Sequence, residues 1–318
     1  MRRRTFLALP LLGVIPGKRF SFPRDHGAHP DFRTEWWYIT GWLDGPVGFQ
    51  VTFFRFRPEV DEANPSAFNP RRILVAHAAL ADPKVGRLVH EERAARAGFS
   101  LAEAEESRTG VWIDDWRIEQ AGDRYDVRIP GRELDFDLSF FARQLVLQGE
   151  GGFSRKGPRP QEASYYYSRP QLNIVGTVNG KEASGTAWLD HEWSSAYLAP
   201  EAGGWDWCGI NLANGDSLMA FRMRKKGGGI YYADPGTSFE VLRTWKSPRT
   251  GTEYPVSVLV KTRQHRLRLE PLMDDQELDA RASTGTIYWE GAVRAFDGKN
   301  VVGHGYLELT GYWKPMKL

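Results

Sequence analysis

The sequence predicts an all-β protein made of two small antiparallel barrels. Short segments in which apolar and polar residues alternate recur along the chain, separated by Gly, Pro, Asn and Asp. Helical periodicity is almost absent, and aromatic residues make up 13% of the chain, including 12 Trp. Such wide side chains suit a sheet face or a cavity wall. At 318 residues the chain is long enough for two domains, each with its own core.

The first half of the chain alternates most regularly. In residues 134–142 four apolar side chains alternate with polar ones, so one face of that strand belongs to the core. Residues 93–106, rich in Ala and Glu, are the one segment in which we expect a helix of any length. The strands that we expect here are 36–43, 48–57, 73–80, 110–119, 125–129, 134–142, 165–169, 172–178 and 185–193.

The Gly/Pro-rich segment 199–204 is the expected domain boundary, because such residues interrupt strands and favour turns. We therefore expect an N-terminal barrel over residues 22–200 and a C-terminal barrel over residues 201–318, preceded by a leader over residues 1–21. The strands expected in the second barrel are 205–212, 217–224, 230–233, 239–245, 254–259, 266–271, 285–295 and 303–311.

The leader predicts export. Its arginines at 2–4 precede Thr5, Phe6 and an apolar run, as in a twin-arginine signal. That run is too short to span a bilayer, so we do not expect an integral membrane protein. The single cysteine, Cys208, excludes an intramolecular disulfide. We expect a periplasmic or otherwise exported protein whose residues 1 to about 17 are cleaved or disordered.

The charge balance argues against a polyanionic partner. With 42 basic and 40 acidic residues the formal net charge is +2, which leaves no global field to attract nucleic acid or an anionic membrane. We therefore expect no nucleic-acid binding.

Two clusters of histidines, acids and tryptophans point to one shared site. The first lies in residues 22–38 and the second in residues 188–195, with Trp205 and Trp207 following. Side chains alternate along a strand, so His191 and Trp193 share one face and Asp190 and Glu192 share the other. By the same rule Glu35 and Trp37 lie opposite Trp36 and Tyr38.

A carboxylate that enters an aromatic barrel should have a raised pKa and could act as a general acid. The alternative is a satisfied hydrogen-bond network in which an acid anchors His191 and the tryptophans only pack. The candidate catalytic residues are His191, Trp193, Glu35, Asp190 and Glu192. The aromatic residues expected to bind the ligand are Trp36, Trp37, Tyr38, Tyr166, Trp205 and Trp207.

Other chemistries have weaker sequence support. His26 and His29 lie in a turn rather than on one face of a helix, and His191 would have to supply a third metal ligand. No cysteine supports such a site, so we expect no metal. Ser194 lacks the surrounding glycines of a nucleophile elbow. The glycines 227–229 look like a hairpin turn rather than a phosphate loop, so no cofactor is expected.

Several segments together resemble the AttH/carotenoid 1,2-hydratase family of lipocalin-like proteins, over nearly all of the chain after the leader. They are residues 22–38, Phe153-Ser-Arg-Lys-Gly157, Tyr165-Tyr-Tyr-Ser-Arg-Pro170, Trp188-Leu-Asp-His-Glu-Trp-Ser-Ser195, Gly204-Trp-Asp-Trp207, Tyr288-Trp-Glu-Gly-Ala-Val293 and Gly305-Tyr-Leu-Glu-Leu-Thr-Gly311. The resemblance implies two consecutive lipocalin-like β-barrels. In the hydratase branch it also implies cofactor-free addition of water to an acyclic carotenoid.

The resemblance leaves two functions open. The hydratase His-x-Trp pattern is similar to His191-Glu192-Trp193, but the accompanying Tyr-x-Asp is missing from residues 218–223 and occurs only further on, at Tyr232 and Asp234. The AttH branch is often encoded with ABC transporter components. We therefore expect either a cofactor-free hydratase or isomerase for an apolar isoprenoid or lipid-like molecule, or a non-catalytic periplasmic carrier that serves a transporter.

Overall fold

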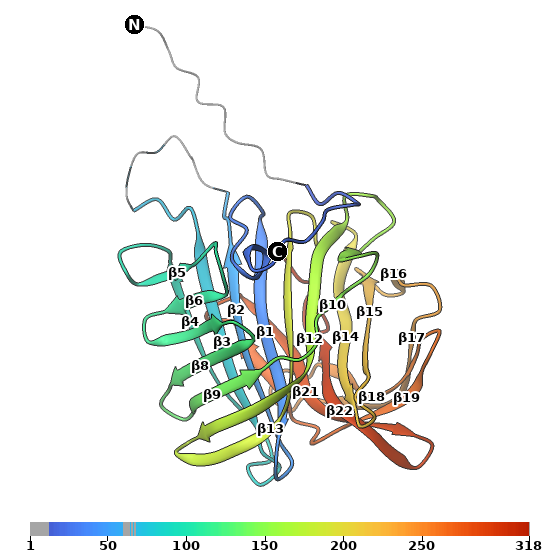
Figure 1. Cartoon of the computed structure of the whole chain (residues 1–318). Coiled ribbons are helices and arrows are strands. Elements are labelled where there is room, and N and C mark those ends of the chain that lie inside the picture. Colours follow the sequence, from blue (N-terminus) through green and yellow to red (C-terminus); the bar gives the residue numbers. More distant parts are fainter. Residues whose placement is uncertain (1–12, 60–63, 65, 67, 318) are drawn as a thin grey trace, which may run out of the picture.

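The protein is nearly all β, as the sequence predicts. The computed structural model describes residues 13–59, 64, 66 and 68–317, and within them the one helical element is a single 3-10 turn, η1 (Arg24–His26). The strands form two antiparallel sheets that stand side by side as a nearly closed barrel and a half-barrel (Figure 1). The chain passes from the first sheet to the second between Ser194 and Ala202.

The first sheet contains thirteen strands in the order β4-β3-β2-β1-β13-β12-β9-β8-β7-β6-β5, with β10 and β11 added to β12. Strands β4 and β6 lie against each other, which brings the two ends of the sheet together. The strands are β1 (Thr34–Leu43), β2 (Val47–Phe56), β3 (Ile73–Ala81), β4 (Leu88–Arg96), β5 (Ala102–Ala104), β6 (Gly110–Ile113), β7 (Trp116–Ala121), β8 (Arg124–Pro130), β9 (Asp135–Phe141), β10 (Val146–Leu147), β11 (Phe153–Arg155), β12 (Ala163–Val178) and β13 (Lys181–Ser194).

The second sheet contains nine strands in the order β16-β15-β14-β22-β21-β19-β18-β17, with β20 added to β21. The strands are β14 (Ala202–Leu212), β15 (Ser217–Lys225), β16 (Ile230–Ala233), β17 (Ser238–Lys246), β18 (Glu253–Lys261), β19 (Arg266–Pro271), β20 (Glu277–Ala280), β21 (Thr286–Asp297) and β22 (Asn300–Leu309).

The expected helix over residues 93–106 is wrong. Its first part belongs to β4, which pairs with β3 over nine consecutive residues, and its last part contains the short strand β5. The Ala and Glu content is only a weak local preference, and the hydrogen bonds and packing offered by β3 override it. Residues 110–119 likewise form two strands, with Asp114 at φ 58° in the turn between them.

The seam between β1 and β13 joins the two clusters that the sequence analysis connected. The register runs from Thr34 opposite Ser194 to Leu43 opposite Gly185 without a bulge. Trp37 therefore lies opposite His191, and Tyr38 opposite Asp190. The expected adjacency of the two clusters is confirmed.

The two sheets are held together by aromatic side chains and a few polar contacts. The cluster of buried side chains between them includes Trp42, Trp188 and Trp207. The Trp42 indole Nε1 donates to the Gly305 carbonyl at 2.9 Å, and His77 bonds to the Tyr288 hydroxyl at 2.8 Å. These contacts tie the first sheet directly to β21 and β22.

The described end of the leader packs on the first barrel. Val14 is buried, and the Ile15 amide and the Tyr165 hydroxyl are 3.1 Å apart. Lys18 pairs with Asp25 at 2.7 Å, and the Phe20 ring lies 5.6 Å from that of Trp193. Residues 1–12, with the twin-arginine motif, lie outside the described residues. Within the part of the leader that the structure describes, Val14, Ile15 and Phe20 thus contact the barrel.

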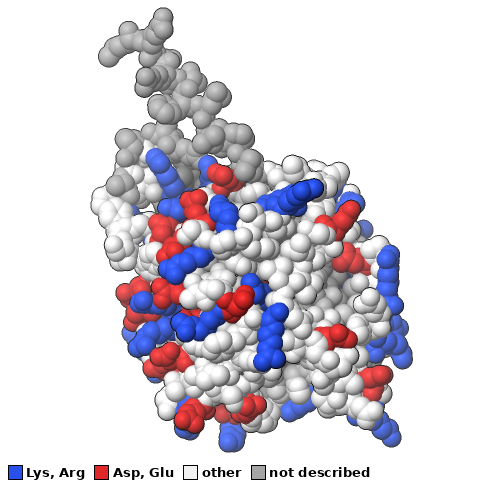
Figure 2. Space-filling view, in the orientation of Figure 1, with Lys and Arg blue, Asp and Glu red and all other residues white. Residues whose placement is uncertain are grey.

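Basic and acidic residues are interspersed over the face seen in Figure 2, without a continuous field of one sign. This distribution agrees with the nearly balanced composition. Among the described residues, no helix has the length and apolar character needed to cross a membrane.

Gly48 on β2 offers a test of the contact between the sheets. A methyl group added there would collide with Ala292 and lie 2.7 Å from the Tyr306 hydroxyl, both in the second sheet. Because tightly packed positions tolerate extra atoms poorly, Gly48→Ala should lower the free energy of unfolding by about 1–3 kcal/mol in urea titrations. Gly13→Ala, where an added methyl meets nothing within 4 Å, is the control. Equal stability of both variants would contradict the tight contact.

Candidate functional site

The seam divides the expected site residues between two places. Glu35, Trp37, His191 and Trp193 point into the first barrel and are fully buried. Trp36 and Tyr38 on β1, with Asp190 and Glu192 on β13, point to the other side, where they line a cavity between the two sheets. The candidate residues therefore do not form a single site.

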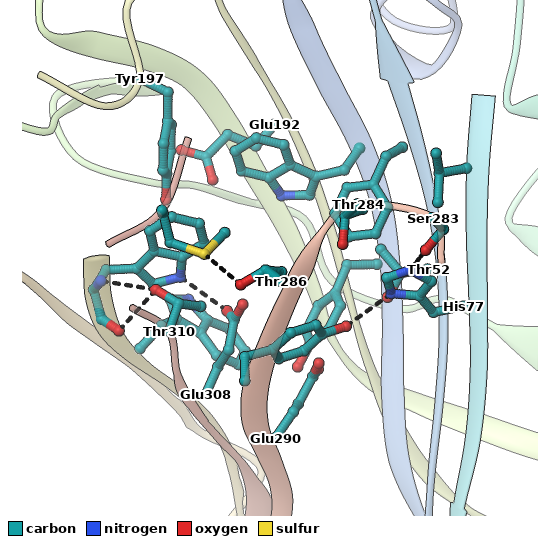
Figure 3. Close-up of a pocket in the computed structure, with 18 of the residues that line it drawn as sticks. Thr52, His77, Glu192, Tyr197, Ser283, Thr284, Thr286, Glu290, Glu308 and Thr310 are labelled. Atoms are coloured by element: carbon teal, nitrogen blue, oxygen red, sulfur yellow. Dashed lines mark hydrogen bonds between the residues drawn. The ribbon is translucent and has the colours of Figure 1, made fainter. Parts of the chain in front are cut away.

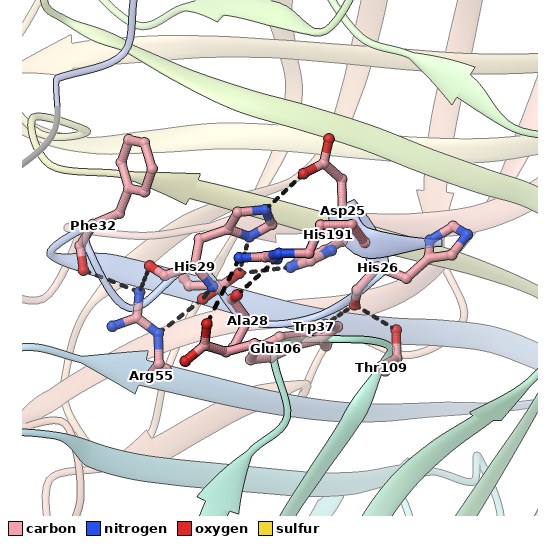
Figure 4. Close-up of polar contacts among 12 residues, drawn as sticks. Asp25, His26, Ala28, His29, Phe32, Trp37, Arg55, Glu106, Thr109 and His191 are labelled. Carbon is pink, nitrogen blue, oxygen red and sulfur yellow. Dashed lines mark hydrogen bonds and ion pairs between the residues drawn. The ribbon is translucent and has the colours of Figure 1, made fainter. Parts of the chain in front are cut away.

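Inside the first barrel, Glu35 is the centre of a polar network, and Figure 4 labels its partners His29, Arg55 and His191. Its carboxylate receives hydrogen bonds from Arg55 Nε at 2.8 Å and from the His29 amide at 2.9 Å. The imidazoles of His29 and His191 lie 2.7 Å and 2.9 Å from its Oε1. Arg55 also donates to the backbone carbonyls of His29 and Phe32, which fixes the segment before β1 on the barrel.

The partners of two imidazoles decide their tautomers. Arg169 can only donate, so His26 Nε2, at 3.2 Å, accepts and His26 Nδ1 carries the proton that goes to the Tyr167 hydroxyl at 2.8 Å. Tyr167 can then donate to His191 Nδ1 at 3.1 Å, and His191 Nε2–H donates to Glu35. The result is a directed chain of hydrogen bonds from Arg169 through His26, Tyr167 and His191 to Glu35.

The sequence-based expectation that Glu35 has a raised pKa is wrong. Burial by itself would raise the pKa, but Arg55, His29 and His191 together hold it well below the usual range. Burial lowers the pKa of His191 to about 4. At neutral pH the network therefore holds an ionised Glu35 and a neutral His191, and neither has a proton to give to a ligand.

The donor set His29, Glu35 and His191 fits a metal centre poorly. Their ligand atoms lie within 4.8 Å of one another. However, each already bonds to another member of the network, and the Arg55 guanidinium occupies the position beside Glu35. A second cation there would meet like-charge repulsion, so we assign this network a structural role.

On the other side of the seam, the two sheets enclose a cavity of about 320 Å³ (Figure 3). Its walls come from β1, β2, β3 and β13 of the first sheet and from β14, β21 and β22 of the second. The lining is mainly apolar and aromatic, and it includes Trp36, Tyr38, Phe54, Phe56, Ile73, Val75, Tyr197, Trp205, Trp207 and Met316. Such a wall suits an apolar ligand.

Four buried carboxyl groups also face this cavity, and two of them are engaged. Asp190 accepts hydrogen bonds from Tyr166 at 2.6 Å, Ser168 at 2.5 Å and Trp188 at 2.6 Å. Burial raises its pKa to about 7, and these donors act against the rise. Little hydrogen-bonding capacity of Asp190 is left for a ligand.

Glu192 forms a buried ion pair. Lys156 Nζ lies 2.7 Å from Glu192 Oε1, and the Ser164 hydroxyl donates to the same oxygen. The ammonium group also lies over the Phe221 ring, 4.2 Å from its centroid. Burial still raises the pKa of Glu192, although Lys156 counteracts it.

Glu290 and Glu308 are the carboxyl groups with the fewest partners. They lie directly opposite each other on β21 and β22, and both face the cavity. Glu308 Oε2 accepts a hydrogen bond from the Trp205 indole at 3.1 Å, whereas Glu290 Oε1 is buried without a partner among the described residues. Burial, reinforced by nearby acids, raises the pKa of Glu308 to about 7 and that of Glu290 well above its usual range. Because each carboxylate disfavours ionisation of the other, the pair keeps a proton to a higher pH than an exposed glutamate does.

The cavity holds one histidine, which is neutral. His77 bonds to the Tyr288 hydroxyl at 2.8 Å and to the Ser283 hydroxyl at 2.9 Å. Burial lowers its pKa to about 3. His77 therefore links the two sheets at the cavity wall and is not a proton donor at neutral pH.

The expected ligand-binding aromatics are also divided. Trp36, Tyr38, Trp205 and Trp207 line the cavity. Trp37 lies inside the first barrel, where its ring stacks on His191, and Tyr166 lies behind Asp190. Tyr232 and Asp234, the nearest match to the hydratase Tyr-x-Asp, bond to each other at 3.3 Å beside a separate surface depression.

Sequence reasoning missed Glu290 and Glu308 as site residues. Both occur as single acids within otherwise apolar segments, at the centres of Trp289-Glu-Gly-Ala292 and Tyr306-Leu-Glu-Leu309. A lone carboxyl group in a central strand is the signal that could have found them. Burying an acid costs free energy, so such a residue is a candidate for a functional site.

Comparisons with known proteins agree with this architecture. The model of the AttH-like family matches residues 13–312. A solved structure from Nitrosomonas europaea, named as a candidate AttH, is 45% identical, with a TM-score of 0.88 over 95% of this chain and all of that chain. Kievitone hydratase from Nectria haematococca is 12% identical, with a TM-score of 0.64 over 92% and 94% of the two chains, a likeness of fold alone. No protein with a curated description matches this chain.

The network around Glu35 predicts a large effect on stability. Glu35→Gln would leave the Arg55 guanidinium buried without its charge partner, so the free energy of unfolding should fall by about 3–5 kcal/mol in urea titrations. The matched control is Glu240→Gln, which removes an exposed pair with Lys261 and should change stability by less than about 0.5 kcal/mol. A loss below about 1 kcal/mol for Glu35→Gln would contradict the structural role.

Proposed function

Because this chain belongs to the AttH-like family, we propose that it binds an apolar isoprenoid or lipid-like molecule between its two sheets and adds water to a double bond of that molecule, or isomerises it, without a cofactor. The observation that carries the proposal is the facing pair Glu290 and Glu308, whose burial in a largely apolar cavity raises the pKa of both carboxyl groups. A carboxylic acid in such surroundings is a general acid near neutral pH.

The chemistry needs only a proton donor, a shielded cation and water. The protonated member of the pair gives its proton to one alkene carbon, which leaves a positive charge on the more substituted carbon. The faces of Trp36, Trp205 and Trp207 and the new carboxylate stabilise this charge. Water then bonds to the cationic carbon and returns a proton to the carboxylate, so that one water is added and the acid is restored. Loss of a neighbouring proton instead would give an isomer.

The second function left open by the sequence is a carrier that binds the same ligand without chemistry, exported by its leader and associated with an ABC transporter. Asp190 and Glu192 are compatible with that role, because their partners already occupy them. The carboxyl group of Glu290, whose Oε1 is buried without a partner among the described residues, favours the enzyme over a carrier for apolar ligands, since such a carrier gains nothing from burying an acid.

Turnover of alkenes tests the proposal. The purified chain is incubated with acyclic carotenoids, shorter acyclic polyenes and prenylated aromatics, and the products are examined by mass spectrometry for the addition of one water. Glu290→Gln and Glu308→Gln should each lower the rate by about 10²-fold or more, because loss of general acid catalysis typically costs that much.

Glu277→Gln is the matched control for these variants. Glu277 is also a buried glutamate of the second sheet, but it bonds to Ser247 and Thr250 and does not line the cavity. The control should keep full activity. Tight binding of the alkenes without turnover of any would support the carrier, and unchanged rates in both cavity variants would exclude the pair as the acid.

The pH dependence follows from the same pair. The acid must be protonated to act, and the raised pKa of Glu308 is about 7. The rate at saturating substrate should therefore be constant below about pH 6 and fall roughly tenfold per pH unit well above pH 7, as measured in initial-rate assays. A rate that rises through this range would mean that the pair acts as a base.

A further inference from the structure

The cavity has three buried polar atoms, here called its floor, of which the proposed reaction uses only that of Glu290. Tyr38 Oη, Gln50 Oε1 and Glu290 Oε1 are buried, belong to residues that line the cavity, and have no hydrogen-bond partner among the described residues. Gln50 is oriented by its own amide, which donates to Thr52 at 2.9 Å. All three unpartnered atoms can accept a hydrogen bond, and an ammonium group placed among them would favour the ionised form of Glu290.

The charges of the lining favour a positive ligand. Four carboxyl groups face the cavity, namely Asp190, Glu192, Glu290 and Glu308. The Lys156 ammonium pairs with Glu192 and is not part of the lining, whereas Lys317 belongs to the lining but is an exposed residue. An anionic head among the four carboxyl groups would lose its hydration without gaining a buried cationic partner, which is costly in an apolar site.

The aromatic walls add to this preference. The rings of Trp36 and Tyr197 pack edge to face with their centroids 4.8 Å apart. Those of Tyr197 and Trp205 pack in the same way with their centroids 5.4 Å apart. Tyr38 and Trp207 form a third perpendicular pair at 5.4 Å. Aromatic faces attract cations, and the attraction grows when the cation is removed from water.

We propose that the cavity binds a long-chain primary amine in its ammonium form, with the ammonium on the floor formed by Tyr38, Gln50 and Glu290 and the hydrocarbon chain towards Phe54 and Phe56. An ammonium group has three donors and no acceptor, which matches three unpartnered acceptors. The volume of about 320 Å³ corresponds to roughly ten waters, so the cavity admits one short chain or one end of a long one.

This inference uses the cavity of the proposed function but does not require turnover. Binding of amines without conversion of any alkene would refute the reaction and leave the amine site intact. Conversion of alkenes without any preference for amines would refute the amine site and leave the reaction intact.

The experiment compares ligands that share one chain and differ in the head group. Decylamine, decanol, decanoate and decyltrimethylammonium are titrated into the full chain at neutral pH, below their aggregation limits, while the fluorescence of the cavity tryptophans or the heat of binding is followed. Decylamine should bind at least about tenfold more tightly than decanol, and decanoate should not bind measurably. Decyltrimethylammonium, which has the charge but no N–H donors, should bind more weakly than decylamine.

Variants separate the floor from the rest of the cavity. Glu290→Gln and Gln50→Leu should each reduce the affinity for decylamine about tenfold and change that for decanol less than about twofold. Glu277→Gln should change neither, and Tyr38→Phe replaces Glu290→Gln if thermal unfolding shows that the latter is not folded. Equal affinities for amine and alcohol, or equal affinities for the primary and quaternary amines, would overturn the proposal.

Discussion

The unbroken antiparallel pairing of β1 with β13 is the constraint on which the rest of the molecule depends. Because side chains alternate along both strands, this one register sends Glu35 and His191 into the first barrel and Tyr38 and Asp190 towards the second sheet. A shift by one residue would exchange the two sets. The charged network would then face the cavity, and the carboxyl groups would face the packed barrel interior.

Much of the fold could be predicted from the sequence, because alternation reports directly on strands. The alternation also assigned Glu35 with Trp37, and His191 with Trp193, to common faces. It could not show that Arg55, twenty positions beyond Glu35, lies beside it, and this partner reverses the effect of burial on the pKa of that carboxyl group. Charge partners brought together by pairing between strands are invisible to local patterns.

The cavity was beyond the reach of sequence reasoning for a related reason. It exists only where two sheets meet, and Glu290 and Glu308 become a pair only through the register of β21 with β22. The segment over residues 93–106 shows the opposite error, in which local composition was given more weight than pairing with β3. In both cases the missing information is a contact between residues far apart in the chain.

The buried carboxyl groups of this protein differ in their pKa shifts because their charge partners differ, although all of them are buried. Glu35 is compensated by Arg55, and Glu192 has Lys156 beside it. Glu290 and Glu308 face each other, and no ion pair is found between either of them and another described residue. The same strand geometry therefore places a charge-paired carboxylate in the barrel interior on one side of the seam and carboxyl groups with raised pKa values on the other.

Because burial raises the pKa values of the facing carboxyl groups, folding is coupled to proton binding at this pair. The pKa of Glu308 rises from 4.5 to about 7 on burial, so between these values the folded chain keeps a proton that the unfolded chain releases. The free energy of unfolding consequently falls as the pH rises through this window, by about 3 kcal/mol for this group alone, and stays lower above pH 7. Small domains have only about 5–15 kcal/mol of stability, so this is a substantial fraction. The contribution of this pair to stability is therefore larger in mildly acidic surroundings than in alkaline ones.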